Sequence, residues 1–180
     1  MRILDIGCGK NKYRGENTDV VIGLDKFPLE GVDVIWNLEN TPLSFKDNEF
    51  DMIIANHILE HIKNFFPLME EVHRITKPNG IIKIKVPFFT SDMAYTNPTH
   101  IRLFTYTTFE YLEPGHFESQ YTKGKFKIIN RKINFIRNPK YSTFNKIINP
   151  IVNKFPIAYQ RLFSWILPCD ELHIEMKVIK

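Results

Sequence analysis

Apolar residues in the first half of the chain gather in short runs separated by turn residues, which is the pattern of strands buried in a parallel sheet. Five such runs cover residues 3–6, 20–24, 32–35, 50–55 and 81–86. Two further candidates follow at 126–136 and 172–179, and the last one alternates between apolar and polar side chains. We predict that these runs form the strands of one sheet.

Helical periodicity appears in three places. Between residues 58 and 75 the apolar positions recur every third or fourth residue, and a Lys-Pro-Asn-Gly turn at 77–80 would end that helix. A shorter helix is predicted near 107–112. Residues 141–167 repeat the helical pattern, with a kink or break expected near Pro150 and Pro156.

The order of these elements predicts an α/β fold over one domain, residues 1–180. We expect a Rossmann-like, doubly wound, mostly parallel sheet with an antiparallel C-terminal strand, and a basic, apolar helical excursion at about 139–168. Residues 10–17 leave too little chain for the crossover helix that normally joins parallel strands. The early crossovers are therefore expected to be abbreviated.

Composition bounds the number of domains and the cellular compartment that we expect. The 180 residues, 43% of them hydrophobic, can build one sizeable core. No apolar run approaches the roughly eighteen residues that span a bilayer, and the chain enters a strand directly, so we expect a cytoplasmic protein without a signal peptide. Cys8 and Cys169 lack the spacing of a disulfide framework or a zinc site.

Charge is divided unevenly along the chain. Residues 119–169 contain ten of the 24 basic residues and no acidic residue, so the remainder has 14 basic and 20 acidic residues. This segregation predicts an anionic group or a membrane surface as partner of the C-terminal part, peripheral to the membrane. A solvated basic face, a cover for the sheet and a dimer surface are the alternatives, and the oligomeric state is left open.

Candidate chemistry begins at residues 3–9, where an apolar run ends in Asp5 and continues through Gly7 and Gly9. Glycine suits a sharp turn at which a ligand approaches the backbone. The next run ends in Asp25, where an acid could accept hydrogen bonds from the two hydroxyl groups of a ribose. The alternative is that Asp25 only begins a surface loop.

The order of motifs resembles the class I S-adenosylmethionine-dependent methyltransferases, in particular the methyltransferase type 11 group. The resemblance runs from Arg2 to Leu112. It rests on Leu-Asp-Ile-Gly-Cys-Gly at 4–9, Asp25, Asn-Leu at 37–38, Asn-His-Ile-Leu-Glu-His at 56–61 and Arg-Ile-Thr-Lys-Pro-Asn-Gly at 74–80. The third glycine of the usual turn is replaced by Asn11, which could supply a left-handed backbone instead.

The resemblance implies S-adenosyl-L-methionine as cofactor and a set of residues that bind it. Asp5 would accept a hydrogen bond from the methionyl ammonium group, Gly7 and Gly9 would let the backbone touch the cofactor, and Asp25 would hold the ribose. Asn37 and Leu38 would meet the adenine. Asn56 and His57 would flank the methionyl end.

Three other interpretations are weaker. His-Ile-Leu-Glu-His at 57–61 matches the letters of a zinc hydrolase motif, but it begins at the tip of a buried strand, and we expect no metal. A nicotinamide cofactor would need a helix after the glycine turn to meet its pyrophosphate. A nucleic-acid amino group as acceptor would need Pro-Pro-aromatic after Asn56, where the chain has His-Ile-Leu.

The expected reaction is methyl transfer to an oxygen or nitrogen atom of a small-molecule, glycan-like or lipid-linked acceptor. If the acceptor is a hydroxyl group a base is useful, and His100 is the first candidate, followed by His57 and His61. Arg102 could pair with a carboxylate or phosphate of the acceptor. A non-catalytic cofactor-binding subunit and a membrane-surface adaptor are the alternatives.

Overall fold

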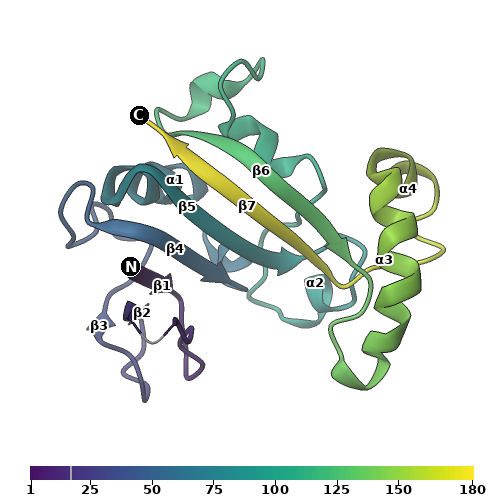
Figure 1. Ribbon diagram of the computed structural model, residues 1–180, viewed down its shortest axis with the longest axis horizontal. Helices are drawn as coiled ribbons and strands as arrows, with labels where there is room; N and C mark the ends of the chain where they lie inside the picture. Colours follow the sequence, from purple (N-terminus) through teal and green to yellow (C-terminus); the bar gives the residue numbers. More distant parts are fainter. Residues whose placement is uncertain (17) are drawn as a thin grey trace.

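The computed structural model describes residues 1–16 and 18–180, and in these residues seven strands form one sheet (Figure 1). The strands are β1 (Arg2–Ile6), β2 (Val20–Asp25), β3 (Val34–Ile35), β4 (Phe50–Asn56), β5 (Thr76–Pro87), β6 (Lys125–Asn134) and β7 (Glu171–Ile179). The α-helices are α1 (Phe65–Ile75), α2 (Met93–Thr96), α3 (Asn145–Lys154) and α4 (Pro156–Leu162). The 3-10 helices are η1 (Leu59–His61), η2 (Thr108–Leu112), η3 (Ser119–Tyr121) and η4 (Pro139–Phe144).

The sheet is mostly parallel and has the order β3-β2-β1-β4-β5-β7-β6. Strands β1 to β5 pair in parallel, whereas β7 is antiparallel to both of its neighbours, β5 and β6. The predicted Rossmann-like class and the antiparallel C-terminal strand are therefore confirmed. Because β7 runs the other way, its first residue, Glu171, pairs with Pro87 at the carboxyl end of β5.

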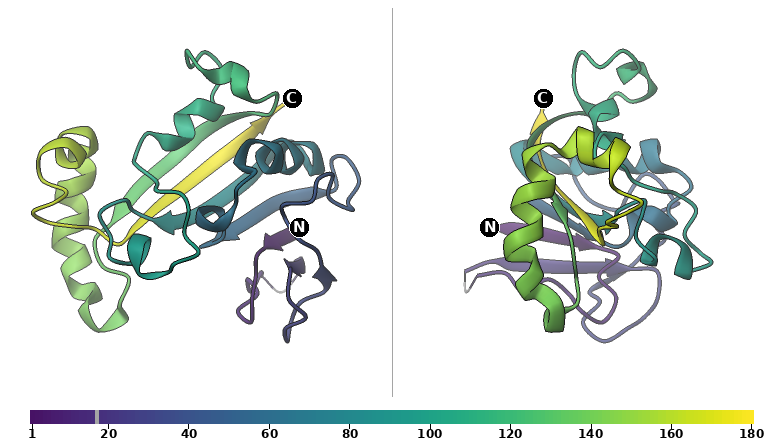
Figure 2. Two further views of the ribbon diagram at one scale, coloured as in Figure 1. Left: turned by 180° about the vertical axis from the view of Figure 1, so that it is seen from behind. Right: turned by 90° about the vertical axis from the view of Figure 1, so that its right-hand side faces the viewer.

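The two faces of the sheet are covered differently. Helix α1 and the segment between β5 and β6 lie over one face, which Figure 2 (left) shows, and the main core fills the space between them. On the other face a small cluster of Ile3, Met52 and Ile54 packs under Tyr13 and Val21. No helix joins β1 to β2 in the described chain, and Asn17 of that connection lies outside the described residues. The predicted abbreviation of the early crossovers is thus observed.

The helix predicted for residues 58–75 is shorter than the periodicity suggests. Only η1 and α1 form, and α1 begins at Phe65. Pro67 explains the break, because a helix continuing from residue 58 would place its ring against the carbonyl of Lys63. The carboxylate of Glu39 accepts the backbone N–H groups of Lys63 and Asn64 instead, at 2.7 and 3.0 Å, and closes the start of α1.

Other boundaries differ by less. The strand predicted at 126–136 spans Lys125–Asn134, and the helix predicted near 107–112 is the 3-10 helix η2. Helix α3 continues through Pro150, and the chain breaks only before Pro156, between α3 and α4. In residues 1–16 and 18–180 no helix combines the length and the apolar character that a membrane crossing requires.

Three asparagines of α3 attach this helix to the edge of the sheet. Asn145, Asn149 and Asn153 are four residues apart, so their side chains lie on one face of the helix. Their amide oxygens accept the backbone N–H groups of residues 136, 135 and 133, at 2.9, 2.8 and 2.7 Å. Strand β6 and the chain beyond it form an edge whose backbone groups would otherwise lack strand partners. The asparagines therefore fix which side of α3 faces the protein.

We predict that Asn149→Ala lowers the free energy of unfolding by about 1 to 3 kcal/mol, because the N–H group of Phe135 loses its acceptor beside a buried helix face. Urea denaturation followed by circular dichroism measures the change. Asn130→Ala is the matched control, since Asn130 is exposed on β6. Equal stability of the two variants would contradict the role of the asparagines.

Candidate functional site

Three cavities of the described chain meet where the parallel strands end, and His57 lines all of them. The lateral cavity, of about 440 Å³, lies beside β2 and is lined by Asp25, Trp36, Asn37 and Leu38 among others. The polar groove, of about 520 Å³, crosses the ends of the strands and is lined by Asp5, Asn56, Lys85, Asn134 and Glu171 among others. The histidine pocket, of about 390 Å³, is lined by His57, Glu60, His61, Asn97, His100 and Arg137 among others.

The turn after β1 separates the lateral cavity from the polar groove, and Gly7 lines both. Gly7 has a φ of +67°, and a Cβ atom there would lie 2.4 Å from Cγ1 of Ile58. The N–H groups of Gly7 and Cys8 donate to the carbonyl of Leu24, at 2.7 and 3.1 Å, which holds the turn against β2. Asn11 does not take the left-handed conformation expected for it. Glycine is thus required at this turn because a side chain would collide with Ile58, and Gly7 borders both cavities.

Asp25 ends β2 and points into the lateral cavity. Its two carboxylate oxygens accept the N–H groups of Gly9, at 2.9 Å, and Phe27, at 3.0 Å. Each oxygen has a further lone pair, so the carboxylate is oriented and can still accept hydrogen bonds from a ligand. Asn37 accepts the N–H group of Glu39 with its amide oxygen, which leaves its amide nitrogen free to donate. Leu38 is buried beside it.

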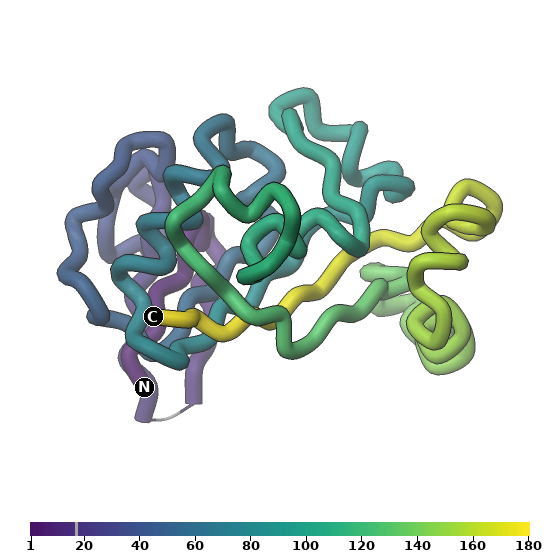
Figure 3. Tube along the Cα trace, turned by 90° about the horizontal axis from the view of Figure 1, so that it is seen from above, coloured from purple at the N-terminus to yellow at the C-terminus, as the bar shows by residue number. Residues whose placement is uncertain are grey.

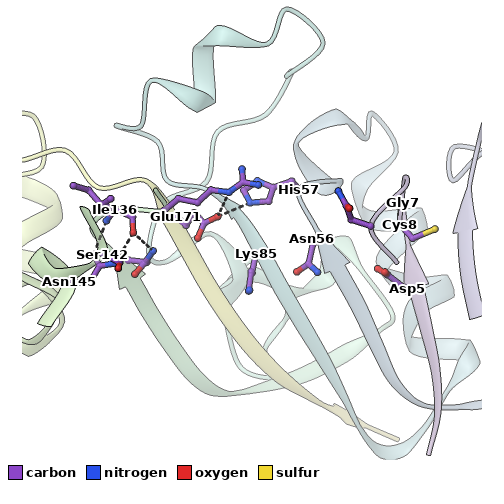
Figure 4. Close-up of a pocket in the computed structure, with 13 residues that line it drawn as sticks. Asp5, Gly7, Cys8, Asn56, His57, Lys85, Ile136, Ser142, Asn145 and Glu171 are labelled. Atoms are coloured by element: carbon purple, nitrogen blue, oxygen red, sulfur yellow. Dashed lines mark hydrogen bonds and ion pairs between the residues drawn. The ribbon is translucent and has the colours of Figure 1, made fainter. Parts of the chain in front are cut away.

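Asp5 is a buried acid at the end of the polar groove (Figure 4). One carboxylate oxygen accepts the N–H group of Tyr13, at 2.7 Å. Burial nevertheless raises the pKa of Asp5 to about 6, because a carboxylate loses its hydration inside the protein. Asn56 of β4 and Lys85 of β5 lie further along the groove, and the two residues are paired in the sheet. The groove is therefore lined mainly by polar side chains.

His57 is held between two acids. Its Nε2 atom donates to Oε1 of Glu171 at 2.8 Å, and its Nδ1 atom lies 3.4 Å from Oε1 of Glu60. Burial disfavours the charged ring, but the hydrogen bond to Glu171 and the nearby carboxylate of Glu60 outweigh it and raise the pKa of His57 to about 9. The ring is therefore protonated at neutral pH. A protonated ring cannot take up a proton, so His57 is not suited to the base role considered for it.

His61 is neutral and its tautomer can be assigned from its neighbours. Burial lowers the pKa of His61. The hydroxyl group of Thr99 donates to the side-chain oxygen of Asn97 at 2.8 Å, so its oxygen accepts from Nδ1 of His61, also at 2.8 Å. The proton of the neutral ring is then on Nδ1. Nε2 of His61 is left with a free lone pair.

His100 packs edge to face against His61, with ring centroids 4.6 Å apart. Its Nε2 atom lies 3.9 Å from Oε1 of Glu60, a buried acid whose carboxylate oxygens have no hydrogen-bond partner among the described residues. Glu60, His61 and His100 offer ligand atoms that lie within 4.8 Å of one another. The letters of the zinc hydrolase motif are not folded as a helix, because His57 has a φ of +51° and η1 begins only at Leu59.

Most of the residues predicted from the sequence come together here, but one does not. Arg102 lines none of the three cavities. Its guanidinium lies 5.1 Å from the centre of the Phe65 ring. Sequence reasoning also missed Lys85, Arg137 and Glu171. Glu171 could have been found from the topology, because an antiparallel strand begins at the edge where its parallel neighbours end.

Comparisons with known proteins find similar methyltransferases. A family model described as a methyltransferase domain matches residues 4–84. Comparison with curated proteins found no match. The similar solved structures show the fold. An S-adenosylmethionine-dependent methyltransferase from Archaeoglobus fulgidus is 22% identical with a TM-score of 0.57, and the match covers 98% of this chain and 85% of that one.

Two further structures extend the comparison. A methyltransferase of the same description from Mesorhizobium loti is 14% identical with a TM-score of 0.58, over 98% of this chain and 90% of that one. Phosphoethanolamine N-methyltransferase 2 of Haemonchus contortus, in complex with S-adenosyl-L-methionine, is 18% identical with a TM-score of 0.58. That match covers 99% of this chain and 48% of the other.

We predict that His57 titrates with a pKa of about 9 and that Glu171→Gln lowers this pKa by roughly one unit or more. Because the raised pKa belongs to the folded state, the ion pair stabilises the fold fully below about pH 6.5 and is lost as the pH rises through 9. NMR titration of the imidazole nitrogens measures both values. Glu175→Gln is the control, since Glu175 lies four residues further along β7, and it should leave the pKa of His57 unchanged. A wild-type pKa near 6.5 would disprove the assignment.

Proposed function

We propose that this chain is a class I S-adenosylmethionine-dependent methyltransferase and that it methylates an oxygen or nitrogen atom of a small-molecule, glycan-like or lipid-linked acceptor. The observation that carries the proposal is the junction at His57, where the lateral cavity, the polar groove and the histidine pocket meet. A cofactor lying across Gly7 would present its reactive group at this junction. An acceptor could reach the same point from the groove or from the histidine pocket.

The residues at the site fit S-adenosylmethionine. The cofactor is an adenosine joined through a sulfonium to an amino acid, and such a shape would cross between the two cavities at Gly7, which lines both of them. Asp25 would accept hydrogen bonds from the ribose hydroxyls, while Asn37 and Leu38 would border the adenine beside Trp36. Asp5 has one carboxylate oxygen without a backbone partner, and the ammonium group would pair with it.

When bound, S-adenosylmethionine supplies a methyl group on a cationic sulfur, and displacement of that group neutralises the sulfur. The chain has to position the acceptor and exclude water from it. His57 lies at the junction as a protonated ring fixed by Glu171 and can donate a hydrogen bond there only by exchanging a present partner. Its main contribution is therefore to hold the shape and the charge of the junction.

His61 is the best base for a hydroxyl acceptor. Its ring is neutral, Thr99 fixes the proton on Nδ1, and Nε2 is free to take up a proton in the histidine pocket. His100 lines the same pocket but lies beside the buried carboxylate of Glu60. We therefore place His61 ahead of His100, which reverses the order expected from the sequence. A positioned general base contributes roughly a hundredfold or more to the rate.

The polar groove supports an acceptor rich in hydrogen-bonding groups. Lys85 and Arg137 provide cationic groups, and Asn56 and Ser142 provide neutral ones, along the lining of this groove. Arg137 is tethered by Glu171, with Nε 3.5 Å from Oε1 of the acid, so its guanidinium stays near the junction. A glycan or a phosphorylated head group would match this lining better than an apolar molecule would.

The experiment that tests the function measures release of S-adenosylhomocysteine in the presence of candidate acceptors, with sugars, sugar phosphates and amines in parallel. We expect release with at least one hydroxyl or amino acceptor, and loss of roughly a hundredfold of that rate in His61→Gln at saturating cofactor, because His61 also borders the lateral cavity. Cofactor binding without release for any acceptor would favour a non-catalytic cofactor-binding role and contradict the proposal.

We predict that Asp25→Ala weakens the binding of S-adenosylhomocysteine by about a hundredfold, because two hydrogen bonds to a charged acceptor are worth about 3 kcal/mol together. Isothermal titration calorimetry measures the affinity, and a thermal melt confirms that the variant is folded. Asp47→Ala is the control, since Asp47 is exposed and pairs with Arg74 away from the cavities. Unchanged affinity in Asp25→Ala would remove the lateral cavity from the proposed site.

We also predict that the affinity for S-adenosylhomocysteine is constant above about pH 6 and falls about tenfold per pH unit below it. The pKa of Asp5 is about 6 in the free protein, and only the ionised carboxylate attracts the ammonium group of the ligand. Calorimetry between pH 5 and 8 gives the profile. Adenosine, which lacks the ammonium group, should show no such dependence. The same pH profile for both ligands would assign the effect to another group.

A further inference from the structure

We propose that α3, α4 and the turn after α4 form a docking surface for an anionic lipid membrane. The docking surface consists of eight apolar side chains, each more than half exposed. They are Phe144, Ile147, Ile151, Phe155, Leu162, Phe163, Trp165 and Ile166. So many exposed apolar side chains on two successive helices are unusual for a surface that meets only water. The inference rests on this surface and does not require the proposed methyl transfer.

The orientation of α3 is imposed by the rest of the protein. Asn145, Asn149 and Asn153 attach one face of the helix to the edge of the sheet. Phe144, Ile147, Ile151 and Phe155 follow one another at intervals of three and four residues and lie on the opposite face. The asparagine contacts therefore require the apolar stripe to point outward. The apolar stripe is therefore not the face by which α3 packs on the protein.

The chain after α4 is anchored in the same way. Tyr159 is buried, and its hydroxyl group donates to the carbonyl of Leu167 at 2.7 Å, which closes the turn between them. The closed turn presents Trp165 and Ile166, which are 69% and 80% exposed. The closed turn thus holds these apolar side chains in solvent before any partner binds, so that binding need not order the turn. Tryptophan is also a residue that favours the boundary between water and lipid.

Positive charge accompanies the apolar side chains. Lys140, Lys146, Lys154 and Arg161 are exposed on the same two helices and the segment before them, and no acidic residue occurs between Ser119 and Cys169. A cleft of about 570 Å³ between β6 and α3 adds Lys132, beside Lys146. Arg131 also lines the cleft, but its guanidinium is paired with Glu110 at 2.6 Å. A basic and apolar helix surface is the combination that binds anionic membranes.

The position of the docking surface suits contact with a membrane. Figure 3 shows α3 and α4 together at one end of the long axis of the molecule, away from both chain ends. The polar groove reaches the same helix, because Ser142 and Asn145 line it. A protein docked through this end would hold the groove close to the lipid head groups.

A second copy of the chain is a poorer occupant of this surface. A symmetric dimer brings each patch against its own equivalent. The four basic side chains would then meet the same four on the partner copy, and the segment offers no carboxylate to balance them. An anionic membrane supplies negative charge over the whole contact area.

The test is flotation of the full chain with vesicles at physiological salt. One set contains phosphatidylcholine alone, and the other contains about one third phosphatidylglycerol. We expect binding to the anionic vesicles that is at least about tenfold stronger than to the neutral ones. The soluble head group glycerol phosphate, added in millimolar excess, should not displace the protein, because it lacks the acyl region that the apolar side chains would enter.

Two variants separate the apolar and the charged contributions. Ile147→Asn with Ile151→Asn removes the centre of the apolar stripe, and Lys146→Glu with Lys154→Glu reverses two charges. Each pair is exposed, so the fold should persist, and we expect each to weaken binding about tenfold or more. Phe117→Ser and Lys46→Glu are the matched controls, since both side chains are exposed on other parts of the chain.

The outcomes are distinct. Loss of binding in both paired variants, with both controls behaving as wild type, supports the proposal. Absence of wild-type binding to anionic vesicles, or equal binding by the paired variants, overturns it. Sedimentation velocity that finds a wild-type dimer and a monomeric Ile147/Ile151 variant, without vesicle binding, would assign the surface to a second copy. Titration with S-adenosylhomocysteine in parallel reports on the proposed function separately.

Discussion

The insertion of an antiparallel β7 between β5 and β6 is the constraint on which the site depends. It brings the start of the last strand to the edge where the parallel strands end, and Glu171 stands there. From this position the carboxylate holds His57, Arg137 and His173 at once. A site begun by the first 61 residues is thus completed by the last strand. The same pairing makes β6 the edge strand to which α3 attaches.

Buried charge gives the site its chemical character. Asp5 is an acid that burial penalises, and a cationic ligand would remove that penalty. Glu171 is also buried, but hydrogen bonds from His173 and His57 outweigh burial and hold its pKa well below the usual range. One acid is therefore satisfied within the protein, whereas the other has capacity left for a partner. Asp5 is therefore the acid of the two that could still take a cationic ligand.

Much of the N-terminal half of the candidate site could be predicted from the sequence because each element there is local. A glycine turn after a strand, and an acid at the tip of the next strand, are recognisable within 25 residues. The helix predicted from residue 58 was wrong in its start because Pro67 overrides the apolar periodicity. Glu171 and Arg137 were missed because their place in the site follows from strand order, which no local pattern encodes.

The histidines show a second limit of sequence reasoning. The sequence placed His100 ahead of His57 and His61 as a base, whereas their distances from the two acids and from Thr99 favour His61. Protonation depends on such neighbours, which arrive from distant parts of the chain. Arg102 illustrates the reverse case, since its segment follows the expected strand but its side chain lies over Phe65.

The most direct test of the account is a crystal structure of the protein with S-adenosylhomocysteine. The account predicts one ligand that crosses Gly7, with its adenine in the lateral cavity beside Leu38, its ribose on Asp25 and its amino group on Asp5. The sulfur should then lie at the junction beside His57. A ligand confined to one cavity, or bound with its amino group away from Asp5, would contradict the central claim.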